Sequence, residues 1–219
     1  MAYGENLKKL SPCDSDLVLS LLREVCPSPE TLLDAGCGRG LRLADALRAL
    51  PETACSGIDA DGENVALARE NCPGAEIVSG DVCALPWQDE SFDAALCECT
   101  LSLLPEPERC LAELRRVLRP GGVLLLSDVC TASGAPAREK LSDSGAVRFL
   151  MSRGWIENAA RGAGFRLLRE RDCREELIAM AAQLLLSGGE ACLGADVFAA
   201  LRRARAGYRL WIWERGETE

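Results

Sequence analysis

A strand-like run that passes directly into closely spaced glycines is the part of this 219-residue chain with the residue types and spacing of a ligand site. It reads Leu32-Leu33-Asp34-Ala35-Gly36-Cys37-Gly38-Arg39-Gly40. Glycine has no Cβ, so the backbone can turn sharply and approach a bound molecule. A helix that begins after such a loop offers unpaired N–H groups and a partial positive charge. We therefore expect a ligand-binding loop here.

The glycine spacing separates the known kinds of loop. In the dinucleotide pattern G-x-G-x-x-G the third glycine would fall at Leu41, which disfavours an NAD-dependent oxidoreductase. The phosphate loop G-x-x-x-x-G-K-[ST] is absent from the sequence. Acids follow the next two strand-like runs, at Asp59 and Asp81. A carboxylate at the position of Asp59 can accept hydrogen bonds from two ribose hydroxyls.

The composition excludes several kinds of chemistry. The sequence contains no histidine, which removes every imidazole base, His-Asp dyad and histidine metal ligand. Its twelve cysteines are scattered and form no C-x-x-C pair, so we expect small buried thiols and no metal site. The net charge of -9 argues against nucleic-acid binding, which depends on lysine and arginine.

No apolar run reaches the roughly 18 residues that a membrane span needs. The first residues, MAYGENLKKLSPC, contain no apolar signal region. We therefore expect a cytoplasmic protein with reduced cysteines and no membrane partner.

The elements that must position these residues alternate along the chain. Solid apolar runs, typical of strands covered on both faces, alternate with amphipathic helical stretches and predict a Rossmann-like, doubly wound α/β sheet. The seven expected strands are Thr31–Ala35, Ala54–Asp59, Ala75–Gly80, Phe92–Cys97, Val123–Asp128, Phe165–Glu170 and Tyr208–Glu214. The expected helices are Asp14–Val25, Leu41–Leu50, Gly62–Asn71, Glu106–Leu118, Trp155–Gly162, Arg174–Ser187 and Ala191–Ala206. The sheet is expected to be mostly parallel, with an antiparallel last strand after a helical insert, and Thr131–Asp143 to be a loop or lid.

The segment Asp34–Gly40 resembles motif I, D-x-G-x-G-x-G, of the class I S-adenosylmethionine-dependent methyltransferases, of the type 11-like kind. The runs Ser56–Asp59 and Ser79–Val82 stand where this family has its next two acids. Leu85–Asp93 resembles the family stretch L-P-F-x-D-x-S-F-D, and Leu118–Gly122 its L-x-P-G-G turn. The resemblance extends over roughly residues 30–170.

The resemblance implies that the cofactor is S-adenosyl-L-methionine. It assigns the ribose to Asp59, the adenine amino group to Asp81 and one face of the adenine ring to Val82, and it gives Cys37 no catalytic role. The cofactor-binding residues it implies are Asp34, Gly36, Cys37, Gly38, Gly40, Asp59, Ala60, Asp81, Val82 and Glu98. It also implies one methyltransferase domain over 1–219, with an N-terminal helical cap (1–29), a cofactor-binding core (30–173), a helical insert (174–206) and a last strand with a tail (207–219).

Methyl transfer from a sulfonium proceeds by in-line displacement and needs no protonated leaving group. Alignment and desolvation can therefore supply much of the catalysis, and a base is needed only where the acceptor must lose a proton. The reacting methyl should project at the end of the fourth strand, where Glu98 is the candidate catalytic residue, as a base or as a positioning group. Asp128 is a candidate for the pocket rim, and Trp155 is either a pocket wall or a core residue.

The acceptor class stays open at this point. A small molecule is the leading hypothesis. A soft acceptor such as a thiol or arsenite, bound through Cys97 and Cys99, is an alternative, although no arsenite-type cysteine signature is present. A non-catalytic S-adenosylmethionine-binding assembly factor is another. The segment with Tyr3 and Lys8 is expected to fold over the cofactor. A last set of residues, either solvated or suited to an anionic partner, is Arg202, Arg203, Arg205 and Arg209.

Overall fold

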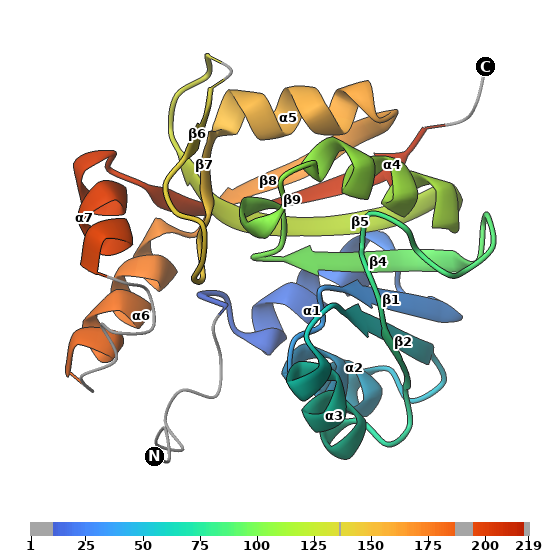
Figure 1. The fold of residues 1–219 in the computed structure, drawn as a ribbon. Coiled ribbons are helices and arrows are strands. Elements are labelled where there is room, and N and C mark those ends of the chain that lie inside the picture. Colours follow the sequence, from blue (N-terminus) through green and yellow to red (C-terminus); the bar gives the residue numbers. More distant parts are fainter. Residues whose placement is uncertain (1–10, 136, 187–194, 217–219) are drawn as a thin grey trace.

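The computed structural model describes residues 11–135, 137–186 and 195–216, and its centre is a single sheet (Figure 1). Five neighbouring strands of this sheet are parallel, as the solid apolar runs predicted. In spatial order they are β3 (Glu76–Ser79), β2 (Ala54–Asp59), β1 (Thr31–Ala35), β4 (Phe92–Glu98) and β5 (Leu118–Thr131).

The far side of the sheet is antiparallel. Strand β9 (Gly207–Arg215) pairs with β5, and β8 (Phe165–Asp172) pairs with the other edge of β9. All seven strands that the sequence predicts are therefore present, and the last one runs antiparallel after a helical insert. The expected Rossmann-like α/β fold is confirmed.

The sheet also contains two short strands that the sequence analysis did not predict. Strand β6 (Arg138–Lys140) pairs antiparallel with β7 (Phe149–Ser152), and β7 pairs parallel with the end of β5 at Cys130 and Thr131. The expectation of a loop over 131–143 is therefore wrong for 138–140. Three or four residues are too few to show an alternating pattern, so this hairpin has no clear signal in the sequence.

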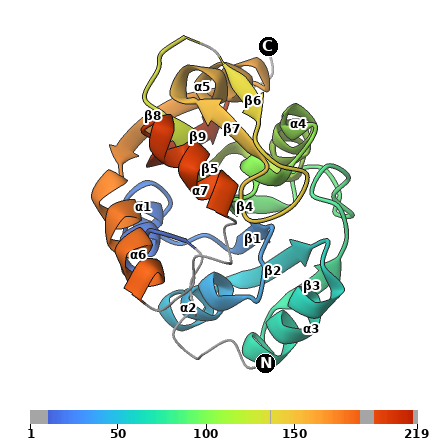
Figure 2. The same cartoon turned by 60° about the vertical axis from the view of Figure 1, so that its left-hand side comes forward.

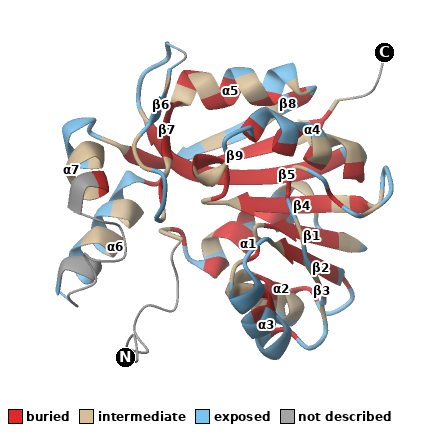
Figure 3. Ribbon diagram, viewed as in Figure 1, coloured by how far each residue is buried: buried red, intermediate tan, exposed pale blue. Residues whose placement is uncertain are grey.

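Helices cover both faces of the sheet. One face packs against α1 (Ser15–Val25), α2 (Leu41–Ala49) and α3 (Gly62–Asn71), and the other packs against α4 (Pro107–Val117) and α5 (Arg153–Gly162). Successive residues of β5 alternate between the two faces: Leu125 lies with the first group of helices and Leu124 with the second. Figure 3 shows the buried residues concentrated in β4, β5 and β9, between these layers.

The helical insert lies at one end of the sheet. It consists of α6 (Arg174–Leu186) and α7 (Ala195–Arg203), and Figures 1 and 2 show α7 beside the β6–β7 hairpin. The start of α6 is tied to the start of β9, because the Cys173 N–H donates to the Tyr208 carbonyl at 2.8 Å. The carboxyl end of the sheet thus carries three additions: the insert, the hairpin and the segment before α1.

No helix within the described ranges is long and apolar enough to cross a membrane. Across the same ranges, no group of three or more cysteine and acidic side chains could hold a metal ion. The eleven described cysteines are free thiols, and all but Cys26, Cys83 and Cys99 are buried. Most of them are therefore small apolar core residues, as expected from their scattered positions.

The stability of the fold should depend on the centre of β5. Leu125 lies between β4 and β9 with 1% of its surface exposed. Leu125→Ala should lower the free energy of unfolding by about 2–5 kcal/mol, because it removes apolar contacts and leaves a cavity. Urea denaturation would measure the loss. The control is Leu186→Ala, because Leu186 is 90% exposed on α6, and equal losses for the two variants would contradict the assignment of the core.

Candidate functional site

The glycine loop between β1 and α2 has an unusual backbone at each of its three glycines. Gly36, Gly38 and Gly40 have φ angles of 81°, 53° and 74°, in the left-handed region that favours glycine. A Cβ on Gly36 would lie 2.3 Å from Thr100 Oγ1, and a Cβ on Gly40 would lie 2.6 Å from Cys72 Sγ. A Cβ on Gly38 would meet nothing within 4 Å. The loop is therefore packed tightly at both ends and faces open space at its middle.

Cys37 belongs to the core and not to the open side of this loop. Its side chain is 7% exposed, and its Sγ lies 3.0 Å from the position a Cβ on Gly57 would take. Burial, together with the nearby Asp34 carboxylate, raises the pKa of the Cys37 thiol. Its backbone N–H and that of Gly36 both donate to the Ile58 carbonyl at 2.9 Å. Cys37 thus contributes its backbone to the site and keeps its thiol inside the protein.

The carboxylate of Asp59 ties the glycine loop to the end of β2. Its Oδ2 accepts from the Gly38 N–H at 2.8 Å, and its Oδ1 accepts from the Asp61 N–H at 2.9 Å and from Asn64 Nδ2 at 3.4 Å. A carboxylate has about four acceptor positions, so this group keeps capacity for a ligand. Asp59 is half-buried, and the neighbouring Ala60 is exposed. The two residues therefore lie next to the open middle of the glycine loop.

The end of β3 lies beside the end of β2. Asp59 and Ser79 are paired in the sheet, and the Gly80 N–H donates to the Asp59 carbonyl at 3.0 Å. Asp81 is exposed, and its Oδ1 accepts from the Cys83 N–H at 2.8 Å. Val82 is 6% exposed and packs in the core beneath it. The structure therefore brings the predicted residues of the first three strands together along one edge.

Glu98, at the end of β4, forms a buried ion pair with Arg42 of α2. Arg42 Nε donates to Glu98 Oε1 at 2.6 Å and Arg42 Nη2 to Glu98 Oε2 at 2.9 Å, and the two side chains are 9% and 10% exposed. Ser11 Oγ donates to Glu98 Oε2 at 2.9 Å, and Arg42 Nη2 also donates to the Cys13 carbonyl at 2.9 Å. This arrangement fits the positioning role predicted for Glu98 better than a role as a free base.

Sequence reasoning missed Arg42. The helix dipole disfavours a cation in the first turn of a helix, so an arginine at this position indicates that an acidic side chain is nearby. That is a weak signal, because the partner is separated from it by 56 residues.

Asp34 lies beneath the glycine loop, with 3% of its surface exposed. Burial raises the pKa of its carboxyl to about 7, the nearby Glu98 carboxylate acts in the same direction, and Arg42 opposes both. Asp34 therefore carries a proton in a substantial fraction of molecules at neutral pH.

The segment after β4 is held from several sides. The Cys99 N–H donates to the Ser127 carbonyl at 2.8 Å, and Thr100 Oγ1 donates to the Ala35 carbonyl at 3.3 Å. Asp128, which is fully buried, accepts from the N–H groups of Ser102 and of its own neighbour Val129 at 2.8 and 2.7 Å. Asp128 thus anchors the turn η1 (Leu101–Leu103) and does not form a rim.

The two cysteines at this strand end point to opposite faces of the sheet. Cys97 packs on the α4 side, where its thiol forms a hydrogen bond with the thiol of Cys110. Cys99 has a φ of 52°, which reverses the alternation of the strand and brings its Sγ to 3.1 Å from the Tyr208 hydroxyl on the other side. These thiols do not converge on one acceptor.

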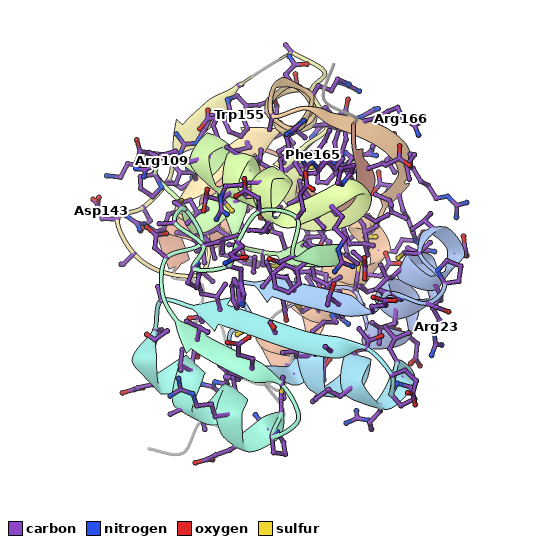
Figure 4. All side chains as sticks on the ribbon, turned by 90° about the vertical axis from the view of Figure 1, so that its right-hand side faces the viewer. Arg23, Arg109, Asp143, Trp155, Phe165 and Arg166 are labelled. Carbon is purple, nitrogen blue, oxygen red and sulfur yellow. The ribbon has the colours of Figure 1, made fainter. Side chains whose placement is uncertain are left out.

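The other predicted residues are spread out. Trp155, labelled in Figure 4, is half-buried at the start of α5 and lies 5.7 Å from the Arg138 guanidinium. Arg209 is paired with Asp172 at 2.9 Å. Arg202, Arg203 and Arg205 are exposed. Tyr3 and Lys8 lie outside the described residues.

Comparison with known proteins gives matches to the same part of the chain. Residues 33–126 match the family model described as "Methyltransferase domain". The phthiotriol/phenolphthiotriol dimycocerosates methyltransferase 1 of Mycobacterium ulcerans is 38% identical over 104 residues, which are 47% of this chain and 38% of that protein. The fatty-acid O-methyltransferase of Mycolicibacterium smegmatis is 31% identical over 157 residues, 71% of this chain and 56% of that protein. The chain thus spans about a third to just over half of these relatives.

A solved structure matches almost all of the fold. The crystal structure of the [4+2]-cyclase SpnF covers 93% of this chain and 82% of that chain, with a TM-score of 0.71 and 26% sequence identity. The match includes the antiparallel side of the sheet, which lies outside residues 33–126.

The glycine loop should tolerate a side chain in its middle better than at its start. Gly38→Ala should lower the free energy of unfolding by about 1–2 kcal/mol, because alanine is strained at a positive φ angle. Gly36→Ala should lower it further, because its Cβ would also clash with Thr100. Urea denaturation of both variants would test this. Gly36→Ala/Thr100→Ala should be more stable than the sum of the single changes predicts, and equal costs for the two glycines would contradict the observed packing.

The buried Asp34 carboxyl should affect how stability depends on pH. Its pKa is raised to about 7 in the folded protein, so between about pH 4 and pH 7 the folded chain holds a proton that the unfolded chain releases. This group therefore lowers stability as pH rises, by up to about 1.4 kcal/mol per pH unit. Denaturation of Asp34→Asn across this range should lack that loss. Asp16→Asn, at an exposed position on α1, is the control, and parallel profiles for wild type and Asp34→Asn would disprove the assignment.

Proposed function

Since the chain belongs to the class I S-adenosylmethionine-dependent methyltransferase family, we propose that it binds S-adenosylmethionine at the glycine loop and transfers the methyl group to a small-molecule acceptor. One observation carries the proposal: the open middle of the loop at Gly38 lies directly beside the Asp59 carboxylate. This places an open turn and a fixed acceptor of hydroxyl hydrogen bonds at the ends of adjacent strands.

The residues present fit the adenosyl part of this cofactor. We assign the ribose hydroxyls to Asp59 and the space beside them to Ala60, because this carboxylate is held by three hydrogen bonds and is half-exposed. The adenine amino group is assigned to the exposed carboxylate of Asp81, with Val82 beside the ring. The backbone of Gly36, Cys37, Gly38 and Gly40 forms the turn, with Asp34 beneath it.

The bound sulfonium supplies an electrophilic methyl group whose leaving group is a neutral thioether. The protein then has to orient the reactants and exclude water. Glu98 and Arg42 do this on the β4 side, because their ion pair fixes the strand end and, through Ser11 and Cys13, the segment before α1. We propose Glu98 as a positioning residue, since both of its oxygens already accept hydrogen bonds.

The relatives support a small-molecule acceptor, because one is named for methyl transfer to phthiotriol/phenolphthiotriol dimycocerosates and another for methyl transfer to fatty acids. The soft-acceptor alternative has less support, since Cys97 and Cys99 point to opposite faces of the sheet. We further propose that residues 30–173 form the cofactor-binding core of one domain. The other parts of this domain are the N-terminal helical cap (1–29), the helical insert (174–206) and the last strand with its tail (207–219).

Calorimetry with S-adenosylmethionine, and with NAD as the competing ligand, tests the proposal. The wild-type protein should bind S-adenosylmethionine and not NAD, and absence of S-adenosylmethionine binding would overturn the proposal. Binding without methyl transfer to any fraction of a cell extract would instead favour a non-catalytic binding protein.

Asp59→Ala should reduce the affinity for S-adenosylmethionine by tenfold or more, because it removes a charged hydrogen-bond acceptor and frees the Gly38 N–H. Titration calorimetry would measure the change, and thermal denaturation would show that the variant is folded. Asp16→Ala is the matched control on the exposed face of α1. Equal affinities for wild type and Asp59→Ala would remove the ribose assignment.

A further inference from the structure

We propose that the helical insert binds to the surface of an anionic lipid bilayer, with apolar side chains of α6 in the bilayer interface and a group of arginines against the lipid phosphates. This inference goes beyond the proposed function and does not depend on it. It comes from two features at one end of the molecule. Apolar side chains of α6 are exposed there, and the arginines beside them have no acidic partner within the described residues.

The outer face of α6 carries an apolar stripe, which consists of Ile178, Ala182 and Leu186. These residues are four positions apart, so they lie above one another on one side of the helix. All three are exposed, and Ile178 and Leu186 keep 60% and 90% of their surface in solvent. Across the described ranges, the other exposed large apolar side chain is Leu67, at 37%. Apolar surface gathered in this way is typical of an interaction site.

The opposite side of α6 attaches the helix to the protein. Leu177 is partly buried against the apolar cluster that contains Tyr208 and Leu210 of β9. Nine residues separate Leu177 from Leu186, and at about 100° per residue the two side chains leave the helix on opposite sides. From Leu177 to Leu186 the sequence contains no charged residue. The apolar stripe is therefore the outward face of an uncharged stretch of helix.

A basic cluster lies where α6 begins and α7 ends. A Cβ on Gly207 would lie 3.5 Å from Nε and from Nη2 of Arg174, so the first residue of α6 lies beside the chain that follows α7. The cluster consists of four exposed arginines, Arg174, Arg202, Arg203 and Arg205. In the part of the chain that the structure describes, none of the four forms an ion pair.

The acids at this end do not balance the basic cluster. Asp172 is paired with Arg209 at 2.9 Å, and Glu176 is paired with Arg171 at 3.2 Å. Glu175 is exposed, but it is a single carboxylate beside four guanidinium groups. The basic cluster therefore retains donors for anions, and a guanidinium binds a phosphate group through paired N–H groups.

The apolar stripe and the basic cluster belong to the same end of the molecule. Val197 and Leu201 of α7 pack against the same apolar cluster as Leu177 of α6, so each helix is attached by one side. Arg202 and Arg203 are turned by about 100° and 200° from Leu201 around the helix axis, away from that attachment. Figure 1 shows the two helices together at one end, and Figure 2 turns that end forward. A surface that approaches this end meets both features.

An anionic bilayer fits this combination better than a second copy of the chain. In a symmetric dimer through the apolar stripe, the arginines would need acids that this end of the molecule does not supply. A bilayer supplies phosphates for the arginines, and its fluid interface accepts protruding side chains without a matching groove. Binding of this peripheral kind requires no membrane-spanning segment, so it is compatible with the short apolar runs of the sequence.

The charge of the rest of the molecule favours one orientation of this contact. The net charge of the chain is -9, so an anionic surface repels the molecule as a whole and attracts it where arginines are unpaired. We therefore expect contact through the α6–α7 end, and we expect salt to weaken it.

Co-sedimentation with vesicles tests the proposal. The protein should sediment with vesicles of mixed phosphatidylglycerol and phosphatidylcholine, and about tenfold less with vesicles of phosphatidylcholine alone, because the arginines require anionic headgroups. Added salt should release it. Absence of binding to the anionic vesicles, or equal binding to both kinds, would overturn the proposal.

A pair of arginine variants tests the basic cluster. Arg202→Gln/Arg203→Gln should weaken binding to the anionic vesicles by about tenfold or more, since each arginine near such a surface contributes roughly fivefold. The matched control is Arg48→Gln/Arg109→Gln, which changes the net charge equally at arginines that are paired on α2 and α4. Equal weakening by both double variants would indicate a general effect of charge and contradict the docking site.

A serine variant tests the apolar stripe. Leu186→Ser should weaken the same binding by about tenfold, because it removes an apolar side chain from the bilayer interface, whereas Leu67→Ser on α3 should leave binding unchanged. Light scattering should find a monomer in the absence of lipid. A dimer that Leu186→Ser dissociates would assign the stripe to a second copy of the chain and overturn the proposal.

Discussion

The attachment of the glycine loop to the end of β2 is the constraint on which the rest of the site depends. The Ile58 carbonyl accepts two N–H groups of this loop, and the next residue, Asp59, accepts a third through its side chain. The loop reaches these partners only because its glycines adopt positive φ angles. Thr100 then fills the space beside Gly36, which ties the segment after β4 to the same turn. The ends of β1, β2 and β4 are therefore held together as one unit by hydrogen bonds and packing within the protein.

The Arg42–Glu98 ion pair fixes the end of β4, on the other side of the glycine loop from β2. Both side chains are about nine-tenths buried, and removal of one partner of such a pair leaves an uncompensated buried charge. The pair also holds Ser11 and Cys13, so it connects α2, β4 and the segment before α1. A carboxylate whose oxygens are committed to a guanidinium is a poor proton acceptor, so the residue best placed for acid–base work serves instead to hold the structure.

Most of the fold could be predicted from the sequence, because its strands are solid apolar runs separated by helices with clear ends. The β6–β7 hairpin could not, since it is too short for a periodic pattern and depends on contacts with β5 and η1. The positions of Asp59 and Asp81 followed from the resemblance to a family, and the structure places both along one edge. Arg42 was missed because its partner is far away in sequence. The separation of Cys97 from Cys99 was equally hidden, because it depends on a positive φ angle at a residue that is not glycine.

The absence of histidine is consistent with the chemistry of the proposed transfer. A sulfonium donor releases a neutral thioether, so its leaving group needs no acid, and the protein has mainly to align the reactants and exclude water. The charged side chains at the ends of β2 and β4 serve to hold the backbone: Asp59 accepts from the glycine loop, and Glu98 is paired with Arg42, which also holds the segment before α1. Charged groups that are used in this way fix the geometry of a site without transferring protons, and methyl transfer from a sulfonium is a reaction for which geometry can suffice.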